Sequence, residues 1–340
     1  MSLSPISEFK TLVPKEVEKI LMIISREGFA LTLVGGAVRD YLLTGKLGDD
    51  LDFELRHIFE FVDKEWTDRV DRLSERLSSK YNYRVEKLAF HSFRIKIDDF
   101  ELEFSSPRLE LFDENLGSGH SNFSVKLISN LEYQKSFARR DFKLNSIGIE
   151  IGAHGDPDNY QLIDPFNGRN DLINKKLNFI NDDFYKDPVR LLRSIRFKLK
   201  LDFEINFSLE KFNIEKLSTH YLKQEAYKVN ILEFCFYSIK LVNDDVLNTR
   251  PDIKSVFSNI IDSKKELDKF EEYLFFVFES NDCNLDHWQS LFQLKSKLIN
   301  DLKYTKENLA LLDIRKFENY NDNNFKLHIN LCERLFFHIN

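Results

Sequence analysis

LTLVGGAVRDYLLTGKLGDDLDFEL, residues 31–55, is the stretch that decides the fold of this 340-residue chain. It predicts, in order, a strand at 31–34, a turn at Gly35-Gly36, a short helix at 37–43 that Gly45 ends, and a second strand that carries Asp50 and Asp52. We expect the rest of the domain to be built around this strand–turn–helix–strand unit.

The glycines and the aspartates of this unit predict a site for phosphate and metal. Two glycines between a strand and a helix let backbone N–H groups approach an anion closely, and the helix N-terminus adds the positive end of its dipole. Side chains alternate along a strand, so Asp50 and Asp52 share one face while Leu51 and Phe53 take the other. Each half of this pattern alone is common, but both halves in this order indicate a carboxylate clamp for a divalent cation.

The pattern resembles the active-site signature of the nucleotidyltransferase superfamily that includes DNA polymerase beta. More narrowly, Gly35-Gly36-Ala37-Val38-Arg39-Asp40 followed by Asp50-Leu51-Asp52 resembles the GGxVRD…DxD motif of the bacterial-type (class II) tRNA nucleotidyltransferase/poly(A) polymerase family. The resemblance implies an α+β fold, with a polymerase-beta-like head of mixed sheet and helices followed by an all-α neck and body. It also implies that Gly35, Gly36 and Arg39 hold phosphates.

Composition limits the classes of protein that the chain can be. Hydrophobic residues make up 42% and charged residues 31%, which is typical of a soluble, globular chain of about two domains. The formal charge of −7 argues against a general polyanion binder, so a nucleic-acid site must be a local basic patch. Three widely spaced cysteines give neither a zinc motif nor a disulfide framework. We expect a cytoplasmic protein, because no targeting segment or membrane-length apolar run is visible.

Periodicity around the central unit predicts the elements that pack against it. Apolar residues at helical spacing predict helices over 14–27 and 63–79, and alternation predicts strands over 92–97 and 101–104. On the last strand, Leu102 and Phe104 are the packed residues, so Glu103 should emerge on the side of Asp50 and Asp52. The nucleotidyltransferase superfamily that the chain resembles often places a third acidic residue on a neighbouring strand, so the resemblance makes Glu103 the candidate for a third catalytic carboxylate, although an exposed glutamate on a solvated face fits the same pattern.

Two later motifs strengthen the resemblance. ARRDFKLNS at 138–146 resembles the family's RRDFTINA, and DPVRLLRSIRF at 187–197 resembles DPLRILRAVRF. The resemblance implies that Arg139 and Arg140 contact the sugar and phosphates of a nucleotide. It implies that Asp187 and Arg190 present hydrogen-bonding groups to the base, with support from Arg193 and Arg196. Asp187 followed by Pro188 is also an ordinary helix start, an alternative that needs no ligand.

Some segments depart from the family pattern. Residues 109–137 lack the arginine-containing element that the family commonly carries there, and their composition predicts a mobile loop. Lys186 stands where the family has Glu, and Tyr221 stands where it has Arg. We expect a catalytic head at 1–166, a helical neck for base recognition at 167–230, and an all-α body at 231–340 that binds RNA.

The reaction that the resemblance implies is nucleotidyl transfer from CTP and ATP to the 3′ end of tRNA, with two Mg²⁺ ions at Asp50 and Asp52. Three alternatives stay open, namely a poly(A) polymerase, an enzyme that adds only CC or only A, and an inactive RNA-binding homologue. The intact Asp-x-Asp pair argues against the last of these.

Overall fold

The computed structural model describes residues 3–112, 123–152, 159–215, 217–226, 228–229, 233–234, 237–238 and 241–251. The chain divides into two compact units. The first contains Met1–Asp187 and Leu201–Phe207, and the second contains Pro188–Lys200 and Ser208–Asn340. Residues 167–187, which the sequence assigned to the neck, lie in the first unit. The predicted division of functions among head, neck and body stays a prediction.

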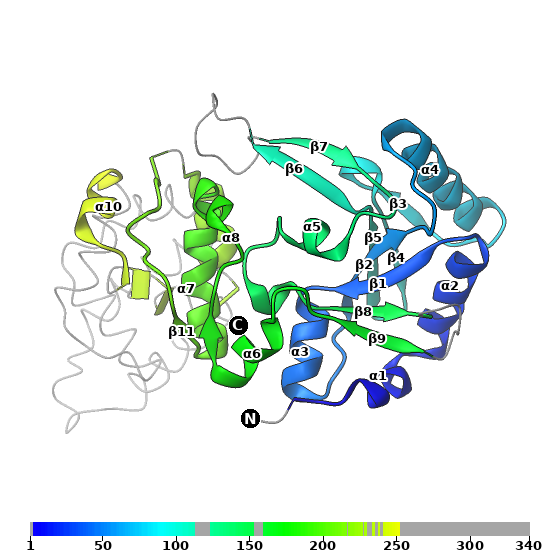
Figure 1. The fold of residues 1–340 in the computed structure, drawn as a ribbon, viewed down its shortest axis with the longest axis horizontal. Coiled ribbons are helices and arrows are strands. Elements are labelled where there is room, and N and C mark those ends of the chain that lie inside the picture. Colours follow the sequence, from blue (N-terminus) through cyan, green and yellow to red (C-terminus); the bar gives the residue numbers. More distant parts are fainter. Residues whose placement is uncertain are drawn as a thin grey trace, which may run out of the picture. The chain divides into compact units, whose positions relative to one another are not determined.

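The first unit is built on a seven-stranded mixed sheet with the strand order β3-β4-β5-β2-β1-β8-β9. The strands, shown in Figure 1, are β1 (Ala30–Val34), β2 (Asp50–Arg56), β3 (Val85–Lys87), β4 (Phe93–Ile97), β5 (Phe100–Ser105), β8 (Gly148–Ile151) and β9 (Tyr160–Ile163). Strand β2 runs antiparallel to β1 and parallel to β5. It therefore lies near the middle of the sheet, with a partner on each side.

Helices cover one face of the sheet and bury its apolar residues. They are α1 (Ile6–Leu12), α2 (Lys15–Arg26), α3 (Gly36–Thr44) and α4 (Asp63–Ser79). Figure 1 shows α2 and α4 on the opposite side of the sheet from α5 (Tyr133–Phe137). Trp66 of α4 is fully buried and packs against Phe29, with ring centroids 5.4 Å apart. The predicted α+β head is thus confirmed, as are the helices predicted at 14–27, 37–43 and 63–79.

The predicted mobile loop over 109–137 is largely wrong. Strands β6 (Arg108–Phe112) and β7 (Phe123–Leu127) pair as an antiparallel ribbon, and α5 follows. Apolar and polar residues alternate along both strands, and this period-two signal outweighs the composition that suggested a loop. Residues 113–122 lie outside the described residues.

The segment after β9 forms a turn that Asp164 caps. Both carboxylate oxygens of Asp164 accept backbone N–H groups, from Gly168 at 2.6 Å and from Arg169 at 3.0 Å, and so cap the first turn of α6 (Gly168–Asn174). Beyond α6, strand β10 (Lys176–Leu177) pairs in parallel with β11 (Glu204–Ile205). The 3-10 helix η5 (Asp182–Lys186) leads to the end of the first unit.

The described part of the second unit is helical, as predicted. It contains α7 (Val189–Leu201), α8 (Thr219–Ala226) and α10 (Asp244–Asn248). Most of the predicted C-terminal body at 231–340 lies outside the described residues. None of the described helices has the length and apolar character that crossing a bilayer requires.

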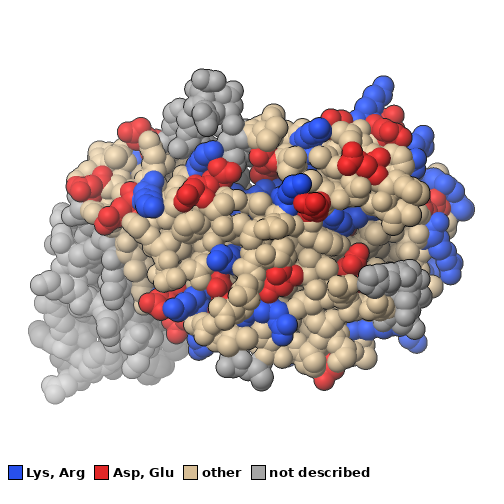
Figure 2. All heavy atoms as spheres, viewed as in Figure 1, with Lys and Arg blue, Asp and Glu red and all other residues tan. Residues whose placement is uncertain are grey.

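Charged side chains of both signs are interspersed on the face of the molecule that Figure 2 shows, with Lys and Arg beside Asp and Glu. No single basic surface dominates the described residues on this face. An anion site therefore has to be found in local geometry.

Candidate active site

Strand β2 carries four ionisable side chains on one face, and they fall into a covered pair and an open pair. Glu54 and Arg56 are buried, with Glu54 only 1% exposed, whereas Asp50 and Asp52 are exposed. The intervening residues Leu51, Phe53 and Leu55 are buried in the helix-covered core.

The covered pair is held by α5 and by Leu131, which precedes that helix. The Ser136 hydroxyl donates to Glu54, and the Arg56 guanidinium donates both to Glu54 and to the carbonyl of Leu131. Arg56 also lies 4.0 Å from the centre of the Tyr133 ring. Burial raises the pKa of Tyr133 to about 12, so this phenol stays neutral, and its oxygen lies 2.7 Å from the Thr32 hydroxyl. These contacts anchor one end of β2 and leave its other end open.

The open pair has the electrostatics of a cation site. Desolvation of the carboxylate raises the pKa of Asp52 to about 6, and the nearby negative charge of Asp50 adds to the shift. Enclosure raises the pKa of Asp50 as well, and the negative charges of Glu101 and Glu103 add to that shift. Carboxylates that repel one another in this way are stabilised by a divalent cation, and oxygen donors are the ligands that Mg²⁺ prefers. The residues present therefore fit a Mg²⁺ site.

Glu103 lies where the alternation predicted. In the parallel pairing of β2 with β5, Asp52 is opposite Glu103, and both neighbours of Glu103 on its strand are buried. Its carboxylate, however, is bound by Arg94 at 3.1 Å, and Arg94 also lies 2.9 Å from Glu101. Among the described residues, no three acidic, His or Cys side chains form a ready set of metal ligands. The placement of Glu103 is confirmed, and its catalytic role stays a prediction.

Arg140 lies beside Asp52 because Gly35 has no side chain. Gly35 has a φ of +78°, which L residues rarely adopt, and a Cβ placed there would be 3.1 Å from Nη1 of Arg140 and 3.8 Å from Oδ2 of Asp52. Burial lowers the pKa of Arg140, while the negative charges of Glu54 and Asp52 oppose that shift. One glycine thus brings a guanidinium and a carboxylate to the same point.

Arg139 extends this positive group toward the β6–β7 ribbon. Its Nη1 lies 3.7 Å from Glu110, whose carboxylate also accepts from Arg108 at 2.9 Å. Burial lowers the pKa of Arg139 to about 9, and the positive charges of Arg108 and Arg140 contribute. Three arginines gathered around few carboxylates favour an anionic ligand. The charges of Arg139 and Arg140 both act on Asp52, and the predicted contact of these arginines with the sugar and phosphates of a nucleotide stays a prediction.

Arg39 is buried and bound to other side chains, whereas a residue that binds phosphate has to be accessible to the ligand. Its side chain is buried, Nη1 donates to Asn145 at 2.7 Å, and Nε donates to Asp40 at 2.7 Å. The amide of Asn145 in turn donates to Asp141 at 2.9 Å. This geometry favours a bracing role, in which Arg39 ties α3 to the RRDF segment. Its contact with phosphate stays a prediction.

The arginines predicted to support base recognition belong to α7 of the second unit. Arg190 is buried, and Arg193 is half-buried. Arg196 forms an ion pair with Glu225 of α8 at 2.7 Å. Asp187 is the last residue of the first segment of the first unit, which also contains Leu201–Phe207. The predicted base-reading edge of Asp187 and Arg190 stays a prediction.

Sequence reasoning missed Glu54, Glu110 and Arg94, which set the charge around the predicted residues. The alternation that selected Asp50 and Asp52 continues to Glu54, and the same alternation relates Glu110 to Arg108. That signal was available for both glutamates. For Arg94 the pairing of β4 with β5 was needed, because register across strands is not visible in one sequence.

Known proteins resemble the chain in sequence. Residues 31–178 match the family model described as the poly(A) polymerase head domain. The CCA-adding enzyme of Blochmanniella floridana is 27% identical over 192 residues, which cover 56% of this chain and 40% of that protein. Poly(A) polymerase I of Haemophilus influenzae is 32% identical over 191 residues, which cover 53% of this chain and 37% of that protein. The aligned part thus spans less than half of these relatives.

Solved structures resemble the chain in fold. A tRNA nucleotidyltransferase crystallised with a primer tRNA and an incoming ATP analogue superposes with a TM-score of 0.62 at 21% identity, over 93% of this chain and 92% of that one. A CCA-adding enzyme in its apo form gives a TM-score of 0.61 at 19% identity, over 98% of this chain and 81% of that one. Residues 31–178, which make up less than half of the chain, therefore match the head domain of the poly(A) polymerase family, and the solved structures share the fold.

Proposed function

We propose that this protein is an RNA nucleotidyltransferase that adds nucleotides from CTP and ATP to the 3′ end of tRNA. One observation carries the proposal, which is the meeting of the Asp52 carboxylate, the Arg140 guanidinium and the side-chain-free Gly35 at the open end of β2. A metal-binding carboxylate beside a phosphate-binding cation is what transfer of a nucleotidyl group needs.

Each residue at this point has a task in the proposed reaction. Asp50 and Asp52 would hold two Mg²⁺ ions, which supply a lower pKa for the attacking 3′-hydroxyl and charge neutralisation for the triphosphate. Arg140 and Arg139 would bind the sugar and phosphates of the incoming nucleotide and fix its α-phosphate in line with that hydroxyl. Glu54 and Arg56, which are buried beneath, keep the strand from moving.

The choice of base is proposed to rest on Asp187 and Arg190. Asp accepts hydrogen bonds and Arg donates them, so together they can pair with the amino group and ring nitrogen that CTP and ATP both present. UTP and GTP present a carbonyl and an N–H instead, and each unpaired group costs about 1–3 kcal/mol. Arg190→Ala should therefore reduce discrimination among the four triphosphates more than it reduces turnover on the best of them. Single-nucleotide incorporation tests this, and an unchanged preference would refute the base-reading role.

A poly(A) polymerase is the second candidate, because the H. influenzae relative at 32% identity carries that name. An A-adding enzyme is a third, because the A-adding tRNA nucleotidyltransferase of Aquifex aeolicus is 28% identical over 194 residues. All three share the same chemistry at Asp50 and Asp52 and differ in primer and nucleotide.

A panel of primers separates these functions. The protein is incubated with Mg²⁺ and with tRNA ending before CCA, tRNA ending in CC, or oligo(A), each with CTP or ATP alone or together. Ordered addition of C, C and A supports the first proposal, and ATP runs on any primer support a poly(A) polymerase. Addition of A only to the CC-ended tRNA supports an A-adding enzyme. No extension of any primer would overturn the proposal.

A further inference from the structure

A strained turn next to the proposed site presents an aromatic ring to solvent. In the 3-10 turn η1 (Ala89–His91), Phe90 and His91 have φ values of +54° and +52°, and Phe90 is 48% exposed. Two consecutive non-glycine residues in this region are rare, and such strain persists only where the surrounding contacts fix it. Backbone strain that holds a large apolar ring in solvent suggests that the ring has a function.

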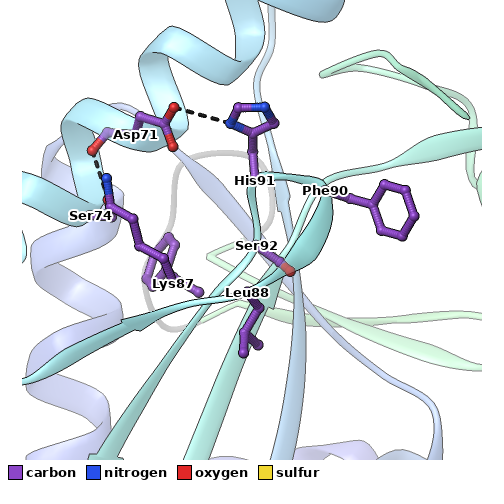
Figure 3. Close-up of a pocket in the computed structure, with 8 residues that line it drawn as sticks. Asp71, Ser74, Lys87, Leu88, Phe90, His91 and Ser92 are labelled. Atoms are coloured by element: carbon purple, nitrogen blue, oxygen red, sulfur yellow. Dashed lines mark hydrogen bonds and ion pairs between the residues drawn. The ribbon is translucent and has the colours of Figure 1, made fainter.

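The contacts that fix the turn are in the structure. The backbone N–H of Leu88 donates to the carbonyl of Ser92 at 2.8 Å, and the Ser92 hydroxyl donates to the carbonyl of Ala89 at 2.6 Å. Nδ1 of His91 lies 3.0 Å from Oδ2 of Asp71 on α4. Figure 3 shows His91 turned toward Asp71, while the Phe90 ring points away from Asp71; all three residues line a pocket of about 490 Å³. The turn therefore has an anchored side and a presented side.

The presented side carries a cation. The guanidinium carbon of Arg108 lies 5.1 Å from the centre of the Phe90 ring. Arg108 is held at 2.9 Å by Glu110, and Glu110 lies 3.7 Å from Arg139. The positive charge of Arg139 in turn acts on the Asp52 carboxylate. Contacts thus run from the exposed ring to Arg139, whose charge acts on the proposed catalytic carboxylate.

We propose that Phe90 and Arg108 form a stacking platform for an unpaired nucleobase of the RNA substrate, near the 3′ end that is extended. The ring offers a π-face to a base, and the guanidinium offers charge to the adjoining phosphate, which is how proteins bind single-stranded nucleic acid without reading its sequence. The identity of the ligand rests on the proposed function, because RNA is the substrate there.

The test measures binding and not catalysis. An unstructured RNA oligonucleotide is titrated, without Mg²⁺ or nucleotide, into the wild type, Phe90→Ala and Phe59→Ala. Phe59 is the matched control, since it is a phenylalanine with 64% exposure outside this cluster. Loss of one stacked base should weaken RNA binding by about fivefold to a hundredfold in Phe90→Ala, with no change in Phe59→Ala. Equal affinity of the wild type and Phe90→Ala would overturn the proposal.

Two further variants separate stacking from a merely structural role. Phe90→Gly relieves the positive φ, so its melting temperature should rise while RNA binding still falls; a rise in melting temperature with full RNA binding would overturn the platform. In Phe90→Trp, RNA should quench the added tryptophan fluorescence and CTP or ATP alone should not. Quenching by the mononucleotides alone would assign the ring to the incoming nucleotide and overturn the RNA platform.

The same experiments distinguish this inference from the proposed function. If Phe90→Ala weakens RNA binding but no primer is extended by the wild type, the platform stands and the enzymatic proposal fails. If primers are extended and Phe90→Ala binds RNA as the wild type does, the platform fails and the enzymatic proposal stands.

Discussion

Asp52 lies on β2 between buried and exposed residues of the same face, and its neighbours on the two sides differ. Toward the covered end, Glu54 is locked by Ser136 and Arg56; toward the open end, Asp50 adds like charge. Arg140 partly offsets that repulsion. The repulsion between the Asp50 and Asp52 carboxylates is unfavourable, and a bound cation would relieve it.

The raised pKa of Asp52, which comes first from burial and then from the negative charge of Asp50, predicts a stability change that depends on pH. The folded-state pKa of Asp52 is raised from 3.8 to about 6, so ionisation opposes folding. Any stability that the protonated carboxyl contributes is present below pH 4 and is lost as pH rises from about 4 to 6. Asp52→Asn should therefore match the wild type at pH 4 and exceed it at pH 8 by about 1 kcal/mol after allowance for solvent screening, or about 2–4 °C in melting temperature. Melting curves without divalent metal at both pH values test this, and a variant less stable than the wild type at pH 8 would contradict it.

Gly35 gives a second prediction at this scale. Gly35→Ala combines backbone strain of about 1–2 kcal/mol with displacement of Arg140, so nucleotide addition should fall at least about tenfold. Gly28 is the matched control, because it also has a positive φ, of +93°, but nothing lies within 4 Å of a Cβ placed there. Gly28→Ala should lose similar stability and keep its activity. Equal loss of activity in both variants would show that strain alone matters.

Among the helices and strands, periodicity in the sequence predicted the elements around residues 31–55. It did not predict contacts between residues that are far apart in the sequence. The strand–turn–helix–strand unit at 31–55 and the face of Glu103 follow from alternation and turn residues, and the structure has them. The ribbon of β6 and β7 was missed because composition was weighed above alternation. The bracing of Arg39 by Asn145 joins residues 106 positions apart, which one sequence does not reveal.

The ion pair between α7 and α8 carries the prediction at this scale. Arg196 and Glu225 are largely buried and lie 2.7 Å apart, so removing the Glu225 carboxylate takes away the negative charge that faces the buried Arg196 guanidinium. Glu225→Ala should lower the free energy of unfolding by about 3 kcal/mol. Lys228 contacts the same carboxylate at 2.8 Å but is 48% exposed, so Lys228→Ala should cost under about 1 kcal/mol. Urea denaturation of both variants tests this order, and equal losses would contradict it.

For the whole molecule, the negative net charge limits the proposed RNA binding. The chain carries a formal charge of −7, and both signs are mixed on the face in Figure 2. Among the described residues of the first unit, Arg108, Arg139 and Arg140 lie close together around Glu110. The proposed RNA binding therefore rests on a few local contacts and on stacking.

This distribution predicts a weak dependence of RNA affinity on salt. Each phosphate contact with a single strand contributes about −0.7 to the slope of log K against log salt, so two to four contacts give a slope of roughly −1.5 to −3. Titration of RNA binding at several KCl concentrations measures it. A slope as steep as that of a broadly basic protein would mean that the RNA site lies elsewhere.

The carboxylates at the open end of β2 are proposed to carry out nucleotidyl transfer. The most direct measurement is Mg²⁺-dependent extension of tRNA lacking its CCA end by the wild type, Asp50→Asn, Asp52→Asn and the adjacent control Asp49→Asn. We predict extension by the wild type and Asp49→Asn, and a loss of at least about a thousandfold in Asp50→Asn and Asp52→Asn with melting temperatures no lower than that of the wild type. Near-normal extension by Asp50→Asn or Asp52→Asn would contradict the proposed catalytic role of these carboxylates.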